Sequence, residues 1–173
     1  LVGRRPPRRV LFVVDRQLGG LRGLVVAELG IDFEVDDALT REFLRQAGAN
    51  VTGITQTTRE AVRAALIEGQ AAGEGIPQLA ARLRQLSAFG PSRAVTVART
   101  ELGHAANTAA LAHYRASGVV VGVRVFDGDY DAECAAMNGR VYTLGQEPAT
   151  LQHPRCRRAF APIVDPAEME RSA

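Results

Sequence analysis

The chain has 173 residues, of which 46% are hydrophobic, and this size fits one domain or a small domain with an appended arm. All 21 basic residues are arginine, yet the net charge of +2 is too small for the whole protein to be a nucleic-acid binder, so any basic patch must be local. With 5% aromatic residues and no tryptophan, the core must consist of Ala, Val and Leu, which favours closely packed helices. No apolar run reaches membrane-spanning length, so no membrane partner is expected. The chain begins with Leu1 rather than Met, and we expect it to be part of a longer chain.

Residues 1–47 are predicted to be an extended basic arm followed by a lead-in segment without a clear pattern. Two prolines among the arginines of the arm exclude a helix there. The arm is interpreted as a solvated linker, with contacts to DNA or an acidic partner as the alternative, and its arginines are Arg4, Arg5, Arg8 and Arg9. Residues 10–17 can form a short strand, and Asp36 or Asp37 can cap a helix that runs to about Ala47.

Three further helices are predicted in the middle of the chain. Thr57 and Glu60 form a T-x-x-E capping box ahead of the first. Pro77 lies in the first turn of the second, where leucines recur at helical spacing. Ser92 can cap a long alanine-rich third helix over 93–116, and a glycine follows its end.

After these helices the hydrophobic period changes to two. Residues 119–126 are predicted to form a strand, and a short helix or turn is expected around Cys134. Asn138-Gly139 is a strong hairpin signal before a return strand over 140–144. A final strand can follow near residue 160. The predicted fold class is therefore α+β: N-terminal helices including a long Ala-rich helix, followed by a small antiparallel β-hairpin or sheet with a Cys/His corner.

That corner contains thiol and imidazole side chains of the kind that tetrahedral zinc selects. The candidate ligands are Cys134, His153 and Cys156. A fourth ligand would have to be Asp131, Asp129 or water. Two other interpretations stay open, namely reduced thiols beside a hydrogen-bonded histidine, or a disulfide between the two cysteines. In all three, the group connects the hairpin to the C-terminal segment, which a small sheet needs for stability.

A polar strip interrupts the alanine-rich helix. Its members are Arg99, Thr100, Glu101, His104 and Asn107. Glu101 and His104 are three residues apart, which invites a general acid/base interpretation. We favour a structural one, because polar groups on a buried helix need hydrogen-bond partners in a neighbouring strand or loop. Glu101 can pair with an arginine such as Arg99 or Arg124.

Two charged groups flank the cysteines. Residues 127–133 hold four carboxylates, but they lack the later glycine and glutamate of a calcium loop, so a solvated acidic turn is predicted. Arg155, Arg157 and Arg158 form a second basic group. Together with the arm, this group can face packaged DNA through contacts to phosphates, which are insensitive to sequence and sensitive to salt.

ARTELGHAANTAALAHYRASGV at 98–119 resembles the A-R-T-E…A-N…Y…G-V signature of phage Mu F-like head-morphogenesis proteins, the minor head proteins of tailed bacteriophages. A helical pair precedes it, and DGDYDAECAAMNGRVYTL and HPRCR follow in the family's order. The motif residues carried over are Arg99, Thr100, Glu101, Asn107, Gly139 and Pro154. Two thiols of the usual pattern are replaced, by Met137 and by Arg158. The resemblance covers residues 48–164 as a head-morphogenesis domain, with a polar tail at 165–173.

The resemblance implies a structural, non-enzymatic minor head protein of a tailed phage or prophage. Its expected partners are the portal protein, other phage head proteins and packaged double-stranded DNA. It would act in head assembly, DNA packaging or ejection. It would reside in the virion, in the capsid interior or at the portal vertex, after assembly in the bacterial host cytoplasm. Two alternatives remain: a metal-dependent hydrolase or toxin-type module with water as fourth zinc ligand, and an arginine-driven DNA-binding module.

Overall fold

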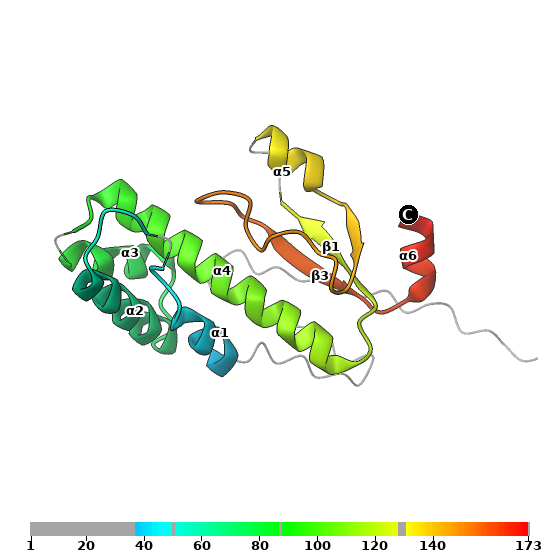
Figure 1. The fold of residues 1–173 in the computed structure, drawn as a ribbon, viewed down its shortest axis with the longest axis horizontal. Coiled ribbons are helices and arrows are strands. Elements are labelled where there is room, and N and C mark those ends of the chain that lie inside the picture. The colour runs from blue at the N-terminus through cyan, green and yellow to red at the C-terminus, as the bar shows by residue number, and fades with distance from the viewer. Residues whose placement is uncertain (1–36, 50, 87, 128–130, 173) are drawn as a thin grey trace, which may run out of the picture.

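The computed structural model describes residues 37–49, 51–86, 88–127 and 131–172. The elements in chain order are α1 (Asp37–Leu44), α2 (Gln56–Ala71), α3 (Ile76–Gln85), α4 (Pro91–Ser117), β1 (Gly122–Phe126), α5 (Ala132–Met137), β2 (Val141–Thr143), β3 (Ala159–Ile163) and α6 (Pro166–Ser172). Helices come first and a small antiparallel sheet follows, which confirms the predicted α+β class (Figure 1). The basic arm, the strand expected over 10–17, and the residues Asp36 and Asp129 lie outside the described residues.

Helices α1 and α3 pack on α4, and α2 packs on α1 and α3. Together they enclose the larger of two cores (Figure 1). Its buried side chains are Leu44, Ala47, Val51, Val62, Leu66, Leu79, Ala80, Leu83, Phe89, Ala94, Val97, Ala98 and Ala105. These are nearly all aliphatic, as a composition with few aromatic residues requires. Leu44 and Ala47 belong to this core, so the packed helical unit already begins at α1.

The capping box expected at Thr57 and Glu60 is wrong, because α2 starts two residues earlier. Thr55 is the N-cap, in an extended conformation, and its side-chain oxygen accepts a hydrogen bond from the amide of Thr58 at 3.2 Å. Glu60 lies inside the helix and accepts from the side chain of Gln56 instead.

The long helix α4 spans both halves of the molecule (Figure 1). Ser92 is not its cap: Gly90 takes the N-cap position without a side-chain hydrogen bond, and Pro91 fills the first turn, where no amide hydrogen is needed. Gly118 ends the helix in the left-handed conformation, at a φ of 67°, as its sequence position predicted. Within the described part of the chain, no helix is both long and apolar enough to cross a membrane.

The sheet has the order β2-β1-β3, and both pairs are antiparallel. Its inner face lies on the C-terminal half of α4 and encloses the smaller core, which consists of Leu111, Val123, Val125 and Phe160. Tyr114 of α4 also donates its hydroxyl to the carbonyl of Phe160, at 3.0 Å. Burial raises the pKa of this tyrosine to about 12, so it stays a neutral donor.

The link between β1 and β2 is longer than the hairpin that Asn138-Gly139 suggested. It contains α5, and Asn138-Gly139 forms the turn between this helix and β2. Asn138 has φ −62° and ψ 128°, Gly139 has a φ of 82°, and the amide of Arg140 returns to the carbonyl of Met137 at 3.1 Å. These angles define a type II turn, which needs glycine at its third position. The short helix or turn expected around Cys134 is thus the helix α5, and the Asn-Gly pair is a turn that joins α5 to β2 rather than β1 to β2.

The outer face of the sheet is partly covered by α6, which lies within residues 165–173. A side chain at Gly122 would overlap Met169, so glycine lets α6 lie directly on β1. Arg124 of β1 pairs with Glu168 of α6 at 3.1 Å. Residues 166–172 are therefore a packed part of the fold.

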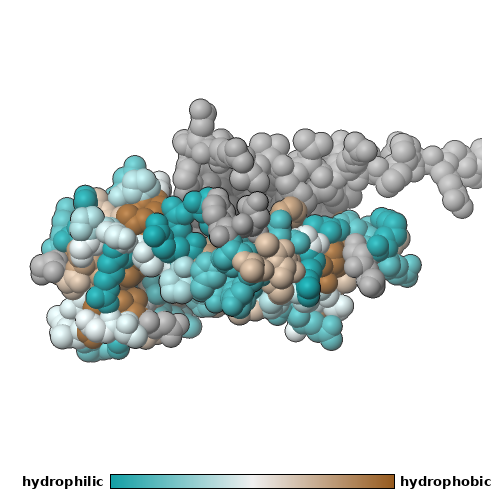
Figure 2. Space-filling view, turned by 90° about the horizontal axis from the view of Figure 1, so that it is seen from above, coloured by the Kyte–Doolittle hydropathy of each residue, from teal (hydrophilic) through white to brown (hydrophobic). Residues whose placement is uncertain are grey.

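The visible surface of the described residues is mostly polar. On the face shown in Figure 2, hydrophilic residues predominate and hydrophobic residues form smaller patches between them. Among the described residues, the large hydrophobic side chains that are exposed are Val119 and Phe126. Scattered exposed hydrophobics of this kind are ordinary for a globular protein, so the polar groups are the better guide to function.

Candidate metal centre

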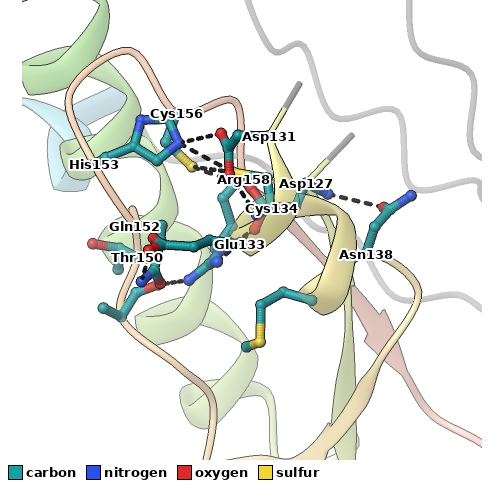
Figure 3. Close-up of polar contacts among 12 residues, drawn as sticks. Asp127, Asp131, Glu133, Cys134, Asn138, Thr150, Gln152, His153, Cys156 and Arg158 are labelled. Carbon is teal, nitrogen blue, oxygen red and sulfur yellow. Dashed lines mark hydrogen bonds and ion pairs between the residues drawn. The ribbon is translucent and has the colours of Figure 1, made fainter. Parts of the chain in front are cut away.

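The three candidate zinc ligands meet between α5 and the β2–β3 loop, which comprises residues 144–158. The Sγ of Cys134 lies 3.2 Å from the Nε2 of His153 and 3.9 Å from the Sγ of Cys156. All three ligand atoms lie within 4.8 Å of one another. Both cysteines are buried free thiols, and Figure 3 shows the three side chains turned toward one another. A metal ion of the zinc type can be held here.

Asp131 positions the first of these ligands through the backbone. It is the N-cap of α5, and its Oδ1 accepts a hydrogen bond from the amide of Cys134 at 2.8 Å. Its other oxygen, Oδ2, lies 2.9 Å from the Nε2 of His153. The amide of Cys134 and, after it, the nearby thiol and imidazole hold the pKa of Asp131 below its ordinary range, so this carboxylate is charged at neutral pH.

The orientation of His153 is fixed from its other nitrogen. Nδ1 lies 2.8 Å from the carbonyl oxygen of Pro154, and because a carbonyl can only accept, Nδ1 carries a hydrogen. This leaves Nε2 facing Cys134 and Asp131. The Pro154 carbonyl, followed by the charge of Asp131, raises the pKa of His153. Histidines that bind metals usually donate the hydrogen of their other ring nitrogen to a carbonyl or carboxylate in this way.

The Cys134 thiol is held in its neutral form when no metal is bound. Burial raises its pKa to about 12, and the neighbouring carboxylates of Asp127 and Asp131 act in the same direction. A metal ion must therefore displace this proton, because only the thiolate binds zinc.

Beneath the cluster lies a buried ion pair that sequence reasoning missed. Asp127 was placed in a solvated turn and Arg158 on a DNA-facing surface, but neither side chain has any exposed area. The Nε of Arg158 donates to the Oδ2 of Asp127 at 2.9 Å, and the Sγ of Cys156 donates to the Oδ1 at 3.1 Å. A signal existed: Asp127 continues the inward alternation of Val123 and Val125. The arginine is thus unavailable to phosphates.

The polar strip of α4 holds the β2–β3 loop in place. Asn107 donates to the carbonyls of Thr150 and Arg158 at 2.9 and 2.8 Å, and the hydroxyl of Thr100 accepts from the amide of Arg155 at 3.0 Å. His104 and Thr150 form a further hydrogen bond through Nδ1 and Oγ1. These bonds place the loop, and with it the ligands His153 and Cys156, against the middle of the helix.

Glu101 departs from its expected pairing with an arginine. Its Oε2 accepts from the amide of Gly48, at 2.9 Å, and so fixes the turn after α1. Glu101 therefore hydrogen-bonds Gly48 and not His104, the residue suggested as its partner in acid/base chemistry. Among the described residues, Arg99 has a buried Nε without a hydrogen-bond partner, and Arg124 pairs with α6 instead.

The remaining arginines of the basic group are at the surface. Arg155 and Arg157 are exposed on the β2–β3 loop. Arg155 has a φ of 69°, which is unusual for a residue other than glycine, and its amide is held by Thr100. The basic group predicted from the sequence is thus divided between two surface residues and one buried one.

The geometry unites the segments on which the family resemblance depended, because the strip of α4, the α5 turn and the His-Pro corner meet at one place. A family model described as phage Mu protein F like protein matches residues 60–161. The chain belongs to this family. Neither a curated protein nor a solved structure matches the chain.

Membership of the phage Mu F-like family supports a role in phage head morphogenesis. The family is a structural one of phage heads, so membership supports interaction with other phage head proteins and a location in the virion. The match begins inside α2 and ends in β3, and it therefore includes the whole candidate metal centre.

Proposed function

We propose that the protein is a non-enzymatic minor head component of a tailed phage or prophage, which contacts the portal protein from the capsid interior or at the portal vertex. The observation that carries this proposal is the family match over 60–161, because its signature residues have structural tasks in this fold. Thr100, Glu101 and Asn107 hydrogen-bond backbone groups of distant segments. Through the portal contact the protein would act in head assembly, DNA packaging or ejection.

Co-purification tests this proposal. The chain, tagged and co-expressed with the portal protein of the same phage or prophage, is expected to retain the portal protein on an affinity column after a high-salt wash. An unrelated tagged helical protein of similar charge serves as the control. Absence of the portal protein from the eluate, together with absence of the chain from purified heads, would exclude a portal-associated role.

We further propose that zinc is the metal of the cluster and that its task is to cross-link. Cys134 belongs to α5, whereas His153 and Cys156 belong to the loop that precedes β3. One ion would connect these two segments beside a sheet whose core is small. Protein purified from cells grown with zinc is expected to contain one zinc per chain, and a Cys134→Ser/Cys156→Ser variant should contain none.

A contact with packaged DNA is supported by Arg155 and Arg157, which are both exposed on the loop. Such contacts would go to phosphates, so affinity for duplex DNA should fall steeply as salt rises. An Arg155→Gln/Arg157→Gln variant should show weaker binding and a smaller salt slope. Equal binding by the variant would exclude these two arginines as the contact.

A further inference from the structure

We propose that Asp131 is the fourth ligand of the metal centre, so that zinc is bound by two thiolates, one imidazole and one carboxylate. This inference rests on the metal binding proposed above and specifies it. Structural zinc sites in proteins are normally closed by four protein ligands, and three side chains alone would leave one position to water. The surroundings of the cluster identify which side chain takes that position.

The spacing of the first three ligands fits tetrahedral zinc. Bonds of about 2.3 Å to sulfur and about 2.0–2.1 Å to nitrogen, at tetrahedral angles, place two sulfurs roughly 3.7 Å apart and a sulfur and a nitrogen roughly 3.5 Å apart. The corresponding distances from the Sγ of Cys134 are 3.9 Å to Cys156 and 3.2 Å to His153. Shifts of a few tenths of an ångström would therefore complete the geometry.

Asp131 and His153 each present a possible ligand atom at the same place. Because Nδ1 of the imidazole carries a hydrogen for the Pro154 carbonyl, Nε2 is the ring atom left to bind a metal ion. The Oδ2 of Asp131 lies 2.9 Å from Nε2, and the Sγ of Cys134 lies 3.2 Å from it. One zinc ion can therefore be bound by all three atoms, in place of the proton that joins Asp131 and His153 in the metal-free protein.

The other nearby carboxylates already have partners. Asp127 is fully buried, and its Oδ2 accepts from the Nε of Arg158 at 2.9 Å. Glu133 points to Gln152, whose amide donates to it at 3.3 Å. Asp131 is 39% exposed and lies beside the half-exposed His153. Among the described residues, this leaves Asp131 as the carboxylate that can close the site, on the side from which a metal ion can enter.

Asp131→Asn is the variant that tests this assignment, because asparagine is as good an N-cap as aspartate and keeps α5 intact while the negative charge is lost. The matched control is Glu133→Gln, which removes a neighbouring charge from the same helix. Zinc affinity would be measured by competition with a chromophoric chelator. Coordination would be measured from the visible absorption of the cobalt(II)-loaded protein, which is intense for a tetrahedral site.

We expect Asp131→Asn to bind zinc at least about 10-fold more weakly, which is the smallest loss seen when even an outer partner of a ligand is removed. Its cobalt spectrum should change, whereas Glu133→Gln should match the native protein in both measurements. Asp131→Ser, which also retains a cap, should behave as Asp131→Asn does. Circular dichroism of each variant establishes that it is folded.

Native affinity and an unchanged cobalt spectrum in both Asp131 variants would overturn the assignment, yet leave zinc binding by the other three ligands intact. Failure of the native protein to bind either zinc or cobalt would overturn the zinc site as a whole. The head-protein role would be unaffected by either result, since it is tested separately by the portal protein.

Discussion

The ion pair between Asp127 and Arg158 lies where the sheet, the loop and the metal cluster meet. Both side chains are fully buried, and Arg158 also donates to the carbonyl of Ala149 at 2.7 Å. The β1–β3 register pairs Val125 with Phe160, and two residues further along it places Asp127 opposite Arg158. Desolvation makes such a pair costly, and its attraction offsets this cost only while both partners are present.

Arg158→Met is therefore expected to destabilise the protein by about 3–5 kcal/mol, because it leaves the Asp127 carboxylate buried without a counter-charge. Denaturant unfolding followed by circular dichroism measures the loss. Arg155→Met, at an exposed position of the same loop, should change stability by less than about 0.5 kcal/mol. The double variant Asp127→Leu/Arg158→Met should recover most of the loss, and a double variant as unstable as the single one would contradict this account.

The pair of His153 and Asp131 makes the stability of the metal-free protein depend on pH. The Pro154 carbonyl and then Asp131 raise the pKa of His153 above its ordinary 6.5. The stabilisation from this histidine is thus fully present below pH 6.5 and is lost as the pH rises through the raised pKa. Asp131 has a lowered pKa, so its contribution is lost only as the pH falls through that lower value.

The Tm of chelator-treated protein is therefore expected to decrease as the pH rises above 6.5. His153→Gln should abolish this decrease, although His104 and His113 remain in that variant. An identical decrease in native protein and variant would show that another group is responsible.

At the scale of elements, α4 acts as the support on which the β2–β3 loop is held. Asn107 is 5% exposed and is the main link, because its one amide group bonds two loop carbonyls. Asn107→Ala leaves both carbonyls buried without a donor, which should cost about 1–3 kcal/mol in the free energy of unfolding. Thr108→Ala is the matched control, since the Thr108 hydroxyl only returns to the carbonyl of His104 within the helix. Equal stability of the two variants would exclude this role for Asn107.

Patterns within single elements were readable from the sequence. The long alanine-rich helix α4 with its terminal Gly118, and the alternation of β1, each depend on local geometry, and each was predicted correctly. The start of α2 was missed because Thr55 and Thr57 are equally good caps, and the sequence alone does not show which one is extended. Chemistry also placed Cys134 with His153 and Cys156, because the chain has two cysteines and three histidines in all.

Contacts between segments that are distant in the sequence could not be predicted from such local patterns. Asp127 lies in an acidic run, and such a run predicts solvated carboxylates. Only the sheet register shows that Asp127 lies opposite Arg158 and is buried. Glu101 bonds the amide of Gly48, a residue 53 positions away, and a single sequence carries no signal for such a pairing. The polar strip could therefore be predicted to find partners, but the partners themselves follow only from the tertiary structure.

At the scale of the whole molecule, the two cores differ in size. The helical core collects buried side chains from four helices and the segments between them, whereas the sheet core has four, from α4, β1 and β3. Buried apolar area is the main source of folding free energy. The half of the molecule that contains the sheet is thus the less stable one, and the metal centre lies in that half.

Removal of zinc is accordingly expected to loosen one half of the molecule only. Zinc present at 100 times its dissociation constant would stabilise the sheet half by about 2.7 kcal/mol, and a chelator should therefore speed amide exchange there by roughly 100-fold. Hydrogen exchange followed by mass spectrometry should show this change in β1, α5 and β3, while α2 and α3 exchange as before. In a Cys156→Ser variant the chelator should have no effect. If the chelator speeds amide exchange in α2 and α3 as much as in the sheet, the two cores unfold as one unit. In that case α4 would couple the stability of the two halves.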